Sequence, residues 1–236
     1  MKWIAGYVAA ICVLLIVIAQ SIFIPTFHMR PYFRWHYARH NVAETIGIDY
    51  DDLHFVTDEL LDYMRGRRAD LLVYAHVNGE YRQFFSDRDI RHMYDVRVLY
   101  EVGFIIRNIA FWLLLFLILG LILFKADVLK VLARCCREVL ATVIILLVIL
   151  AGVIAFDWDR AFVIFHEIFF DNDYWMLTHG TDPLIDMVGH PFFLYIAIIV
   201  GFLFVVFSAI IITVSSIYLH MTKPQNDVRI VARWYY

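Results

Sequence analysis

Four long apolar stretches constrain this chain more than any other feature of its sequence. They lie in residues 1–24, 102–124, 139–156 and 192–219, and 62% of the whole chain is hydrophobic. A helix of about 20 apolar residues crosses the hydrocarbon core of a bilayer, and ordinary soluble domains are far less hydrophobic. We therefore expect a membrane protein, mainly α, with four transmembrane helices. The first stretch is too long for a signal peptide and no small-residue cleavage site follows it, so we expect an uncleaved anchor.

The basic residues indicate how these helices are oriented. The short loop 125–138 and the tail 220–236 are rich in lysine and arginine, whereas the loop 157–191 has only Arg160 against seven acidic residues. The positive-inside rule then predicts that both termini and the 125–138 loop are cytoplasmic. Segment 25–101 becomes a small extracellular α+β cap, and 157–191 becomes an extracellular loop at the membrane interface.

Local signals predict the elements of the cap. Asn78-Gly79 between β-favouring residues is typical of a hairpin turn. Ser86 and Asp89 form an S-x-x-D capping box at the start of a helix that runs without proline towards the second span. An earlier helix is expected to begin near Thr57 and to end at Gly66.

The second outer loop contains an aromatic stripe with one histidine in it. Five residues recur at helical spacing, namely Phe162, Phe165, His166, Phe169 and Phe170. This pattern predicts an amphipathic helix that lies in the interface with its aromatic face towards the lipid. A turn at 172–175 and a short helix after Asp182-Pro183 are expected to follow.

Two histidines are the main candidates for chemistry. His166 is either a structural histidine on an apolar face or a base near the lipid headgroups, because partial burial keeps an imidazole neutral. His92 lies three residues before Asp95, which fits a base with an orienting carboxylate but also fits an ordinary surface pair. Arg107, near the outer end of the second span, is either functional or extends to the headgroups.

Several enzyme classes lack their motifs. His166-Glu167 begins an HExxH zinc motif, but Phe170 stands where the second histidine is required. No GxSxG elbow occurs, and Cys12, Cys135 and Cys136 match no metal or disulfide pattern. We expect no metal, no cofactor and no nucleic-acid partner. An enzyme of this kind would use histidine acid/base chemistry on a nucleophile supplied by its substrate.

Two stretches resemble one bacterial membrane-protein family. "FVIFHEIFFDNDYWMLTHGTDPLIDMVGHPFF" (162–193) is similar to the outer-loop signature of the lipoprotein intramolecular transacylases, and "FSDRDIRHMYDVRVLY" (85–100) resembles their second signature. The family's four spans with an extracellular cap also match. The turn Thr178-His179-Gly180 departs from the family pattern, which more often has a short acidic or proline-bearing turn.

The resemblance implies an activity and a site in the bacterial plasma membrane. Members move the sn-2 acyl chain of a diacylglyceryl lipoprotein to the α-amine of its N-terminal cysteine, and two histidines, here His92 and His166, do the work. We expect Asp95, Asn172 and Asp182 to fix the ring tautomers. The expected substrate-binding residues are Phe162, Phe165, Phe169, Phe170, Tyr174, Trp175 and Arg107.

Two other readings of the sequence stay open. A non-enzymatic membrane sensor or assembly protein would tolerate the loss of both histidines without any chemical effect. An interfacial lipid esterase would use the same histidines and release a fatty acid, although no side-chain nucleophile is evident. The expected partners of the transacylase are diacylglyceryl lipoproteins and membrane lipids.

Overall fold

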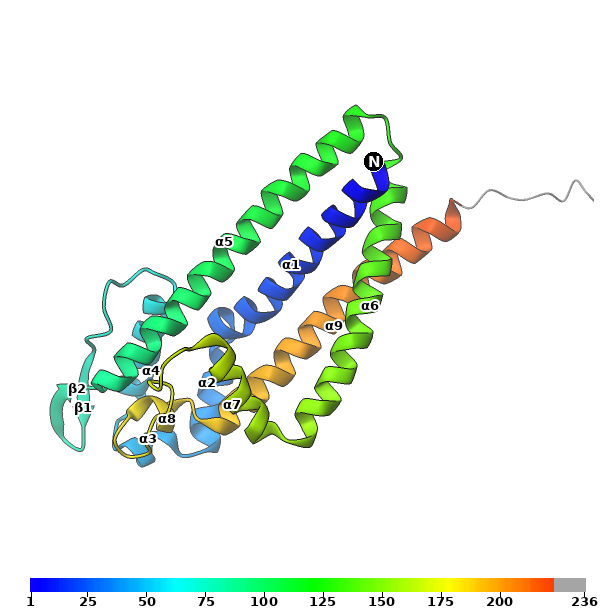
Figure 1. Cartoon of the computed structure of the whole chain (residues 1–236). Helices are drawn as coiled ribbons and strands as arrows, with labels where there is room; N and C mark the ends of the chain where they lie inside the picture. Colours follow the sequence, from blue (N-terminus) through cyan, green and yellow to red (C-terminus); the bar gives the residue numbers. More distant parts are fainter. Residues whose placement is uncertain (223–236) are drawn as a thin grey trace, which may run out of the picture.

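The computed structural model describes residues 1–222. Four of its helices are long and apolar enough to cross a membrane, namely α1 (Lys2–His28), α5 (Asp87–Leu123), α6 (Val128–Phe156) and α9 (His190–Met221). The shorter elements gather at one end of these helices, and the N-terminus and the α5–α6 connection lie at the other end (Figure 1). The chain is thus a multi-pass, mainly helical membrane protein, as the sequence predicts. Most of the 220–236 tail lies outside the described residues.

Helix α1 lies between the other long helices. It packs against α5, α6 and α9, and α6 also packs against α9. Figure 1 shows α5 on one side of α1 and the α6–α9 pair on the other. Towards α5, the rings of Phe23 and Phe104 have centroids 4.3 Å apart. Towards α6, a Cβ at Gly6 would lie 2.9 Å from the Sγ of Cys135, so glycine permits the close approach of these two helices.

Helix α5 begins with the predicted capping box. The Ser86 hydroxyl accepts a hydrogen bond from the Asp89 amide at 3.0 Å, and Asp89 Oδ2 accepts one from the Ser86 amide at 3.0 Å. At 1.5 Å per residue, the 37 residues of α5 measure about 55 Å. Because the hydrocarbon core of a bilayer is only about 30 Å thick, the first four turns, residues 87–101, extend beyond the apolar span 102–124.

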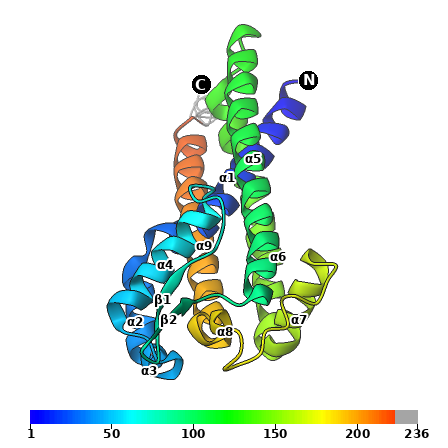
Figure 2. The same cartoon turned by 90° about the vertical axis from the view of Figure 1, so that its left-hand side faces the viewer.

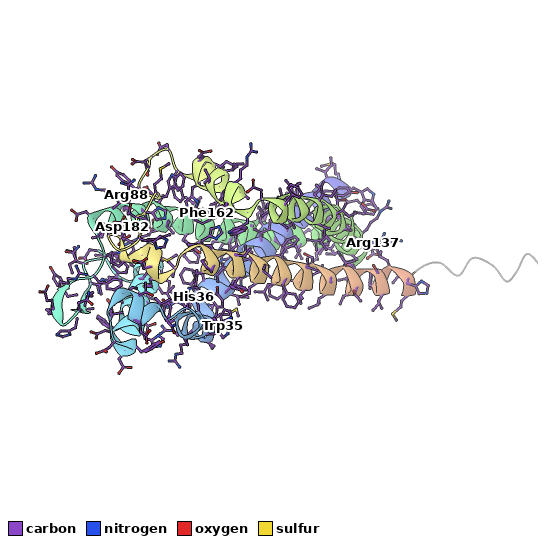
Figure 3. All side chains as sticks on the ribbon, turned by 90° about the horizontal axis from the view of Figure 1, so that it is seen from below. Trp35, His36, Arg88, Arg137, Phe162 and Asp182 are labelled. Atoms are coloured by element: carbon purple, nitrogen blue, oxygen red, sulfur yellow. The ribbon has the colours of Figure 1, made fainter. Side chains whose placement is uncertain are left out.

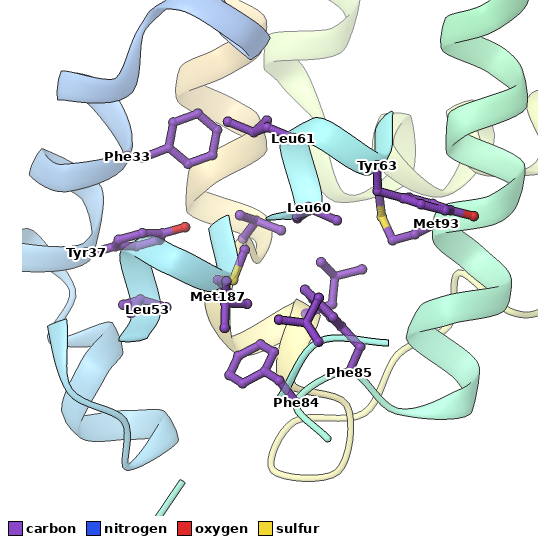
Figure 4. Close-up of a cluster of buried hydrophobic side chains, with 14 of the residues drawn as sticks. Phe33, Tyr37, Leu53, Leu60, Leu61, Tyr63, Phe84, Phe85, Met93 and Met187 are labelled. Carbon is purple, nitrogen blue, oxygen red and sulfur yellow. The ribbon is translucent and has the colours of Figure 1, made fainter. Parts of the chain in front are cut away.

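The cap, residues 25–101, packs around one hydrophobic core. Its elements are α2 (Arg30–Arg39), α3 (Val42–Ile46), α4 (Tyr50–Met64) and the antiparallel hairpin of β1 (Tyr74–Val77) and β2 (Glu80–Gln83). Figure 4 shows Leu53, Leu60 and Leu61 of α4 in the core together with Phe85 and Met187. Met187 belongs to α8 (Pro183–Met187), so the second outer segment completes the core of the first. Figure 2 shows these elements from the side of the hairpin.

The hairpin turn is as predicted, and the helix before it is longer than predicted. Asn78 and Gly79 have φ values of 55° and 83°, as a tight hairpin turn requires. Helix α4 begins at Tyr50 with Asp49 as its N-cap, so the predicted start at Thr57 is wrong. Thr57 is buried inside the helix, where its hydroxyl donates to the Leu53 carbonyl at 2.7 Å.

The segment between α6 and α9 contains the helix that the aromatic stripe predicts, but Phe170, the last residue of the stripe, follows this helix in an extended conformation. Helix α7 (Trp158–Phe169) is capped by the Asp157 carboxylate, which accepts a hydrogen bond from the Arg160 amide at 3.0 Å. Helix α6 extends beyond the predicted span 139–156. Residues 128–138, expected in a loop, form its first turns, because Asp127 caps them by accepting from the Lys130 amide at 3.1 Å.

Candidate active site

The two candidate histidines meet at the cap end of the molecule. His92 lies in the second turn of α5 and His166 lies in α7, and their ring centroids are 6.0 Å apart. Their side chains are nearly enclosed, with exposed fractions of 8% and 6%. Figure 3 places Phe162 of the same helix, together with Arg88 and Asp182, at this end and Arg137 towards the other. Two residues 74 positions apart thus form one pair.

The protein backbone fixes the tautomer of His166. Its Nδ1 lies 2.7 Å from the Phe162 carbonyl oxygen, and a carbonyl can only accept, so Nδ1 carries the hydrogen. The other nitrogen, Nε2, then holds a free lone pair. Burial lowers the pKa of His166 below its ordinary value, and the bond to Phe162 opposes this in part. His166 is therefore a neutral imidazole with a basic Nε2 near pH 7.

His92 has a more apolar and less satisfied environment. Its ring meets the edge of Phe170 at 5.3 Å between centroids. Its buried Nδ1 has no hydrogen-bond partner among the described residues. Burial, and then the proximity of His166, lowers the pKa of His92 to about 4. His92 is accordingly neutral at physiological pH and has one nitrogen still to be satisfied.

Aromatic rings enclose His166 on several sides. Trp175 stacks on its imidazole at 4.8 Å, and Phe162 lies 4.2 Å away between centroids. Phe165 and Phe169 pair with each other at 4.7 Å, and both are about half exposed on the outer face of α7. The aromatic lining expected from the sequence therefore divides into rings that cover the histidines and rings that face outward.

A stripe of polar residues on α5 holds the loop that carries Trp175. Arg88 donates to the Asp173 carbonyl, and Arg91 donates to the Tyr174 hydroxyl at 3.1 Å. Asp95 accepts from the Asn172 amide at 2.9 Å. Residues 88, 91 and 95 follow helical spacing, so they share one face. Together they attach residues 172–174 to α5 and place Trp175 against His166.

The three expected supporting residues form their side-chain hydrogen bonds with groups other than the imidazoles in the described part of the chain. Within residues 1–222, Asp95 is bonded to Asn172 and not to His92. Asp182 accepts from the Ser86 hydroxyl at 2.6 Å and from the Thr178 amide at 2.8 Å. None of these bonds reaches an imidazole, and the expected role in fixing ring tautomers stays a prediction. These residues bind the second outer segment to the start of α5.

Arg107 is not part of this cluster. It lies 15 residues beyond His92 in the same helix, which is about 22 Å at 1.5 Å per residue. Its guanidinium lies over the rings of Phe23 and Phe104 at 5.5 and 5.4 Å and donates to the Asn108 side chain. Its contacts are therefore those of the α1–α5 interface.

Sequence reasoning assigned Asp89 to the capping box alone and missed the two loop-binding arginines. Asp89 is fully buried, and this burial, with the nearby charge of Asp182, raises the pKa of its carboxyl to about 7. The one available signal was its position, three residues before His92. Arg88 and Arg91 gave no signal, because their partners belong to a distant loop.

A second group of histidines lines a cavity between the cap and the segment that leads into α9. The cavity measures about 210 Å³ and its lining includes His36, His40, His179 and His190. The His179 ring is bonded to Asp186 at 2.5 Å. Across residues 1–222 no three potential ligands are arranged to hold a metal ion.

Comparisons with known proteins agree with these observations. The model of one family, described as "Lipoprotein intramolecular transacylase Lit", matches residues 7–193. The structure of the lipoprotein intramolecular transacylase Lit from Bacillus cereus superposes with a TM-score of 0.75 at 17% identity, covering 94% of this chain and 97% of that one. Two structures of the same Bacillus cereus protein, each with a single histidine replaced, by alanine or by arginine, superpose with TM-scores of 0.71 at 17% identity. They cover 94% of this chain and 94% and 93% of their own. Among curated proteins, none matches this chain.

Proposed function

Since the chain belongs to the lipoprotein intramolecular transacylase family, we propose that it moves an acyl chain within a diacylglyceryl lipoprotein. The sn-2 chain passes from the glyceryl oxygen to the α-amine of the N-terminal cysteine, and the product is a lyso-form lipoprotein. The single observation that carries this proposal is the pair of buried, neutral imidazoles 6.0 Å apart within an aromatic enclosure.

The reaction needs little from the protein beyond geometry and proton transfer. An amide is more stable than an ester, so the shift from oxygen to nitrogen is downhill. The substrate supplies both the nucleophile and the electrophile, and holding them together contributes several kcal/mol to lowering the barrier. A site whose candidate catalytic groups are two histidines is suited to such a reaction, because histidines can transfer protons.

The tautomer of His166 suits it to be the general base. Its Nδ1 is occupied by the Phe162 carbonyl, so its Nε2 is the nitrogen able to take the proton of the attacking amine. His92 faces it and is suited to donate a hydrogen bond to the oxyanion and a proton to the departing glyceryl oxygen. The N–C bond forms, the C–O bond breaks, and the proton lost by the amine is balanced by the one gained by the oxygen.

The aromatic enclosure supports transfer over hydrolysis. Trp175, Phe162 and Phe170 surround the His166 ring at centroid distances of 4.8, 4.2 and 5.6 Å. Water that reached the acyl group would turn transfer into ester hydrolysis, so its exclusion preserves the acyl chain. The exposed Phe165 and Phe169 offer an apolar surface for the acyl chains in the lipid.

The charge distribution supports an orientation for the site. The 125–138 segment is basic and the 157–191 segment is acidic, so we place both termini in the cytoplasm and the cap outside the bacterial plasma membrane. The histidine pair then lies at the outer surface of the membrane, where the diacylglyceryl group of a mature lipoprotein resides.

Mass spectrometry tests this proposal. Purified wild type, His92→Ala and His166→Ala are incubated with a synthetic diacylglyceryl lipopeptide whose N-terminal cysteine has a free amine. His179→Ala is the matched control, since this histidine lies in the same outer segment but is exposed. We expect wild type and the control to move one acyl chain to an N-terminal fragment without a change of parent mass, and both site variants to fail.

The other outcomes separate the competing functions. Loss of the mass of one fatty acid would identify an interfacial esterase. An unchanged substrate with folded protein in suitable lipid would contradict the transacylase proposal and favour a non-enzymatic sensor or assembly protein.

A further inference from the structure

Three residues in the first two turns of α5 each have one buried polar atom without a partner in the described part of the chain. Of the seven buried side-chain atoms without a partner in the described residues, three are Arg88 Nε, Asp89 Oδ1 and His92 Nδ1. Spacings of three and four residues bring Asp89 and Arg88 next to His92 on the helix surface. Leaving such an atom unpaired destabilises the folded protein. Arg88 and Asp89 are therefore each placed to share a hydrogen-bond partner with His92.

The chemistry of the three atoms fits a single water molecule. Arg88 Nε–H is a donor, a carboxyl oxygen of Asp89 donates or accepts according to its protonation, and a neutral imidazole nitrogen does either according to its tautomer. A buried water typically makes about three hydrogen bonds to such atoms. Asp89 Oδ2 is already used by the Ser86 amide, so Oδ1 is the oxygen left for this purpose.

Burial and neighbouring groups decide where a proton resides. Burial, and then the charge of Asp182, raises the pKa of the Asp89 carboxyl to about 7. Burial, and then the proximity of His166, lowers the pKa of His92 to about 4. Arg88, Arg91 and Asp95 are the other charged groups of this helix near the pair. Near neutral pH the available proton therefore belongs to Asp89 and not to His92.

A neutral His92 can donate a proton only if it gains one at its other nitrogen. We propose that Asp89 is a positioning residue of His92 and supplies this proton through one water that Arg88 Nε also holds. This inference rests on the proposed transacylase function. Asp89 Oδ1–H donates to the water, and the water donates to His92 Nδ1, which leaves the hydrogen of this ring on Nε2 and directed to the substrate.

The proton then moves along this chain as the ester bond breaks. His92 Nε2–H passes to the glyceryl oxygen, the water protonates Nδ1, and Asp89 becomes a carboxylate. His166 holds the proton taken from the amine and releases it to solvent. His92 Nε2 then gains a proton from solvent, and Nδ1 returns its proton through the water to Asp89, which restores the starting state. The C–O bond breaks as the N–C bond forms, and no net proton is consumed.

The decisive variant is Asp89→Asn, compared with Asp95→Asn. The two carboxylates flank His92 at equal spacing, and an asparagine at 89 retains an oxygen for the Ser86 amide. We expect Asp89→Asn to lower kcat by about 100-fold, the scale of general acid catalysis, with KM changed less than about twofold. Equal losses of kcat in Asp89→Asn and Asp95→Asn would contradict a specific role of Asp89.

The pH profile separates this role from a structural one. Asp89 must be protonated, so wild-type kcat is expected to fall as pH rises through about 7. The Asp95→Asn variant should keep this fall of kcat at alkaline pH, and the Asp89→Asn variant should lose it. Asp182→Asn removes the facing charge and moves the limb to lower pH. A limb that stays unchanged in Asp89→Asn overturns the proposal.

An infrared titration gives a readout that does not depend on activity. The carbonyl stretch of a protonated buried carboxyl group should be present in wild type below about pH 7, disappear above it, and be absent from Asp89→Asn. If the wild type shows this band but moves no acyl chain, the proposed function fails and the protonated Asp89 stands. If the band is missing from wild type, Asp89 is not the proton source, whether or not the protein moves an acyl chain.

Discussion

The hydrogen bond between Asp95 and Asn172 offers a quantitative test of how the loop is held over His166. Asn172 donates to the Asp95 carboxylate at 2.9 Å, and both side chains are half-buried. A fully protected hydrogen bond to a charged group contributes about 1.5–3 kcal/mol. With solvent access on both sides we take about 1 kcal/mol, which corresponds to about fivefold in rate, since 1.36 kcal/mol is tenfold.

The assay is a double-mutant cycle on the rate of acyl transfer. Asp95→Ala is expected to lower kcat/KM by about fivefold, because the loop then leaves His166 more often. Asn172→Ala should lose at least as much, since its Oδ1 also accepts from the Tyr174 amide at 3.0 Å. The double variant should lose no more than Asn172→Ala alone, because the bond to Asp95 is already broken there. Tyr81→Ala, an exposed residue of the hairpin, controls for general effects of substitution. Losses that multiply to about 25-fold would refute the idea that the two residues act through one bond.

Three further predictions follow from the described contacts. Trp175→Ala uncovers the His166 ring, so the ratio of released fatty acid to transferred acyl chain should rise several-fold, as measured by mass spectrometry of the lipopeptide products. The neutral form of His166 is the active base, and the pKa of this residue is lowered. As the pH is lowered, kcat should therefore begin to fall only below pH 6.5. A pH–rate profile in which this fall begins above pH 6.5 would contradict the prediction. Gly47→Ala should destabilise the cap more than Gly79→Ala in detergent thermal denaturation. Both glycines have positive φ, but a Cβ at Gly47 would meet the Asn78 side chain at 2.0 Å, whereas none of the described atoms lies within 4 Å at Gly79.

Local rules account for the parts of the fold that the sequence predicted. The four spans follow from long apolar runs, the hairpin from Asn78-Gly79, and the start of α5 from Ser86 and Asp89. Helix α4 departed from prediction because Thr57, a common N-cap residue, donates its hydroxyl to the helix's own Leu53 carbonyl instead. An N-cap preference gives way where tertiary packing buries the residue.

The candidate site depends more on contacts between distant segments. His92 and His166 were identified by resemblance to a family, since no spacing rule joins residues 74 positions apart. Asp95 shares a helix face with His92, as expected, but Asn172 from the second outer segment occupies its carboxylate. In the sequence, Asp89 looked like a simple capping residue. The burial that raises its pKa comes partly from α8, a distant segment whose Leu184 is also buried there.

The central position of α1 has a consequence for how the chain assembles. Helix α1 packs against α5, α6 and α9, while α5 makes most of its long-helix contacts with α1. Chains are synthesised from the N-terminus, and N-terminal parts generally fold first. Helices α5 and α9 therefore enter a bilayer that already holds their principal neighbours, α1 and α6, whereas α6 gains its second large interface only when α9 follows. Helix α1 is thus available as a packing surface to each later helix.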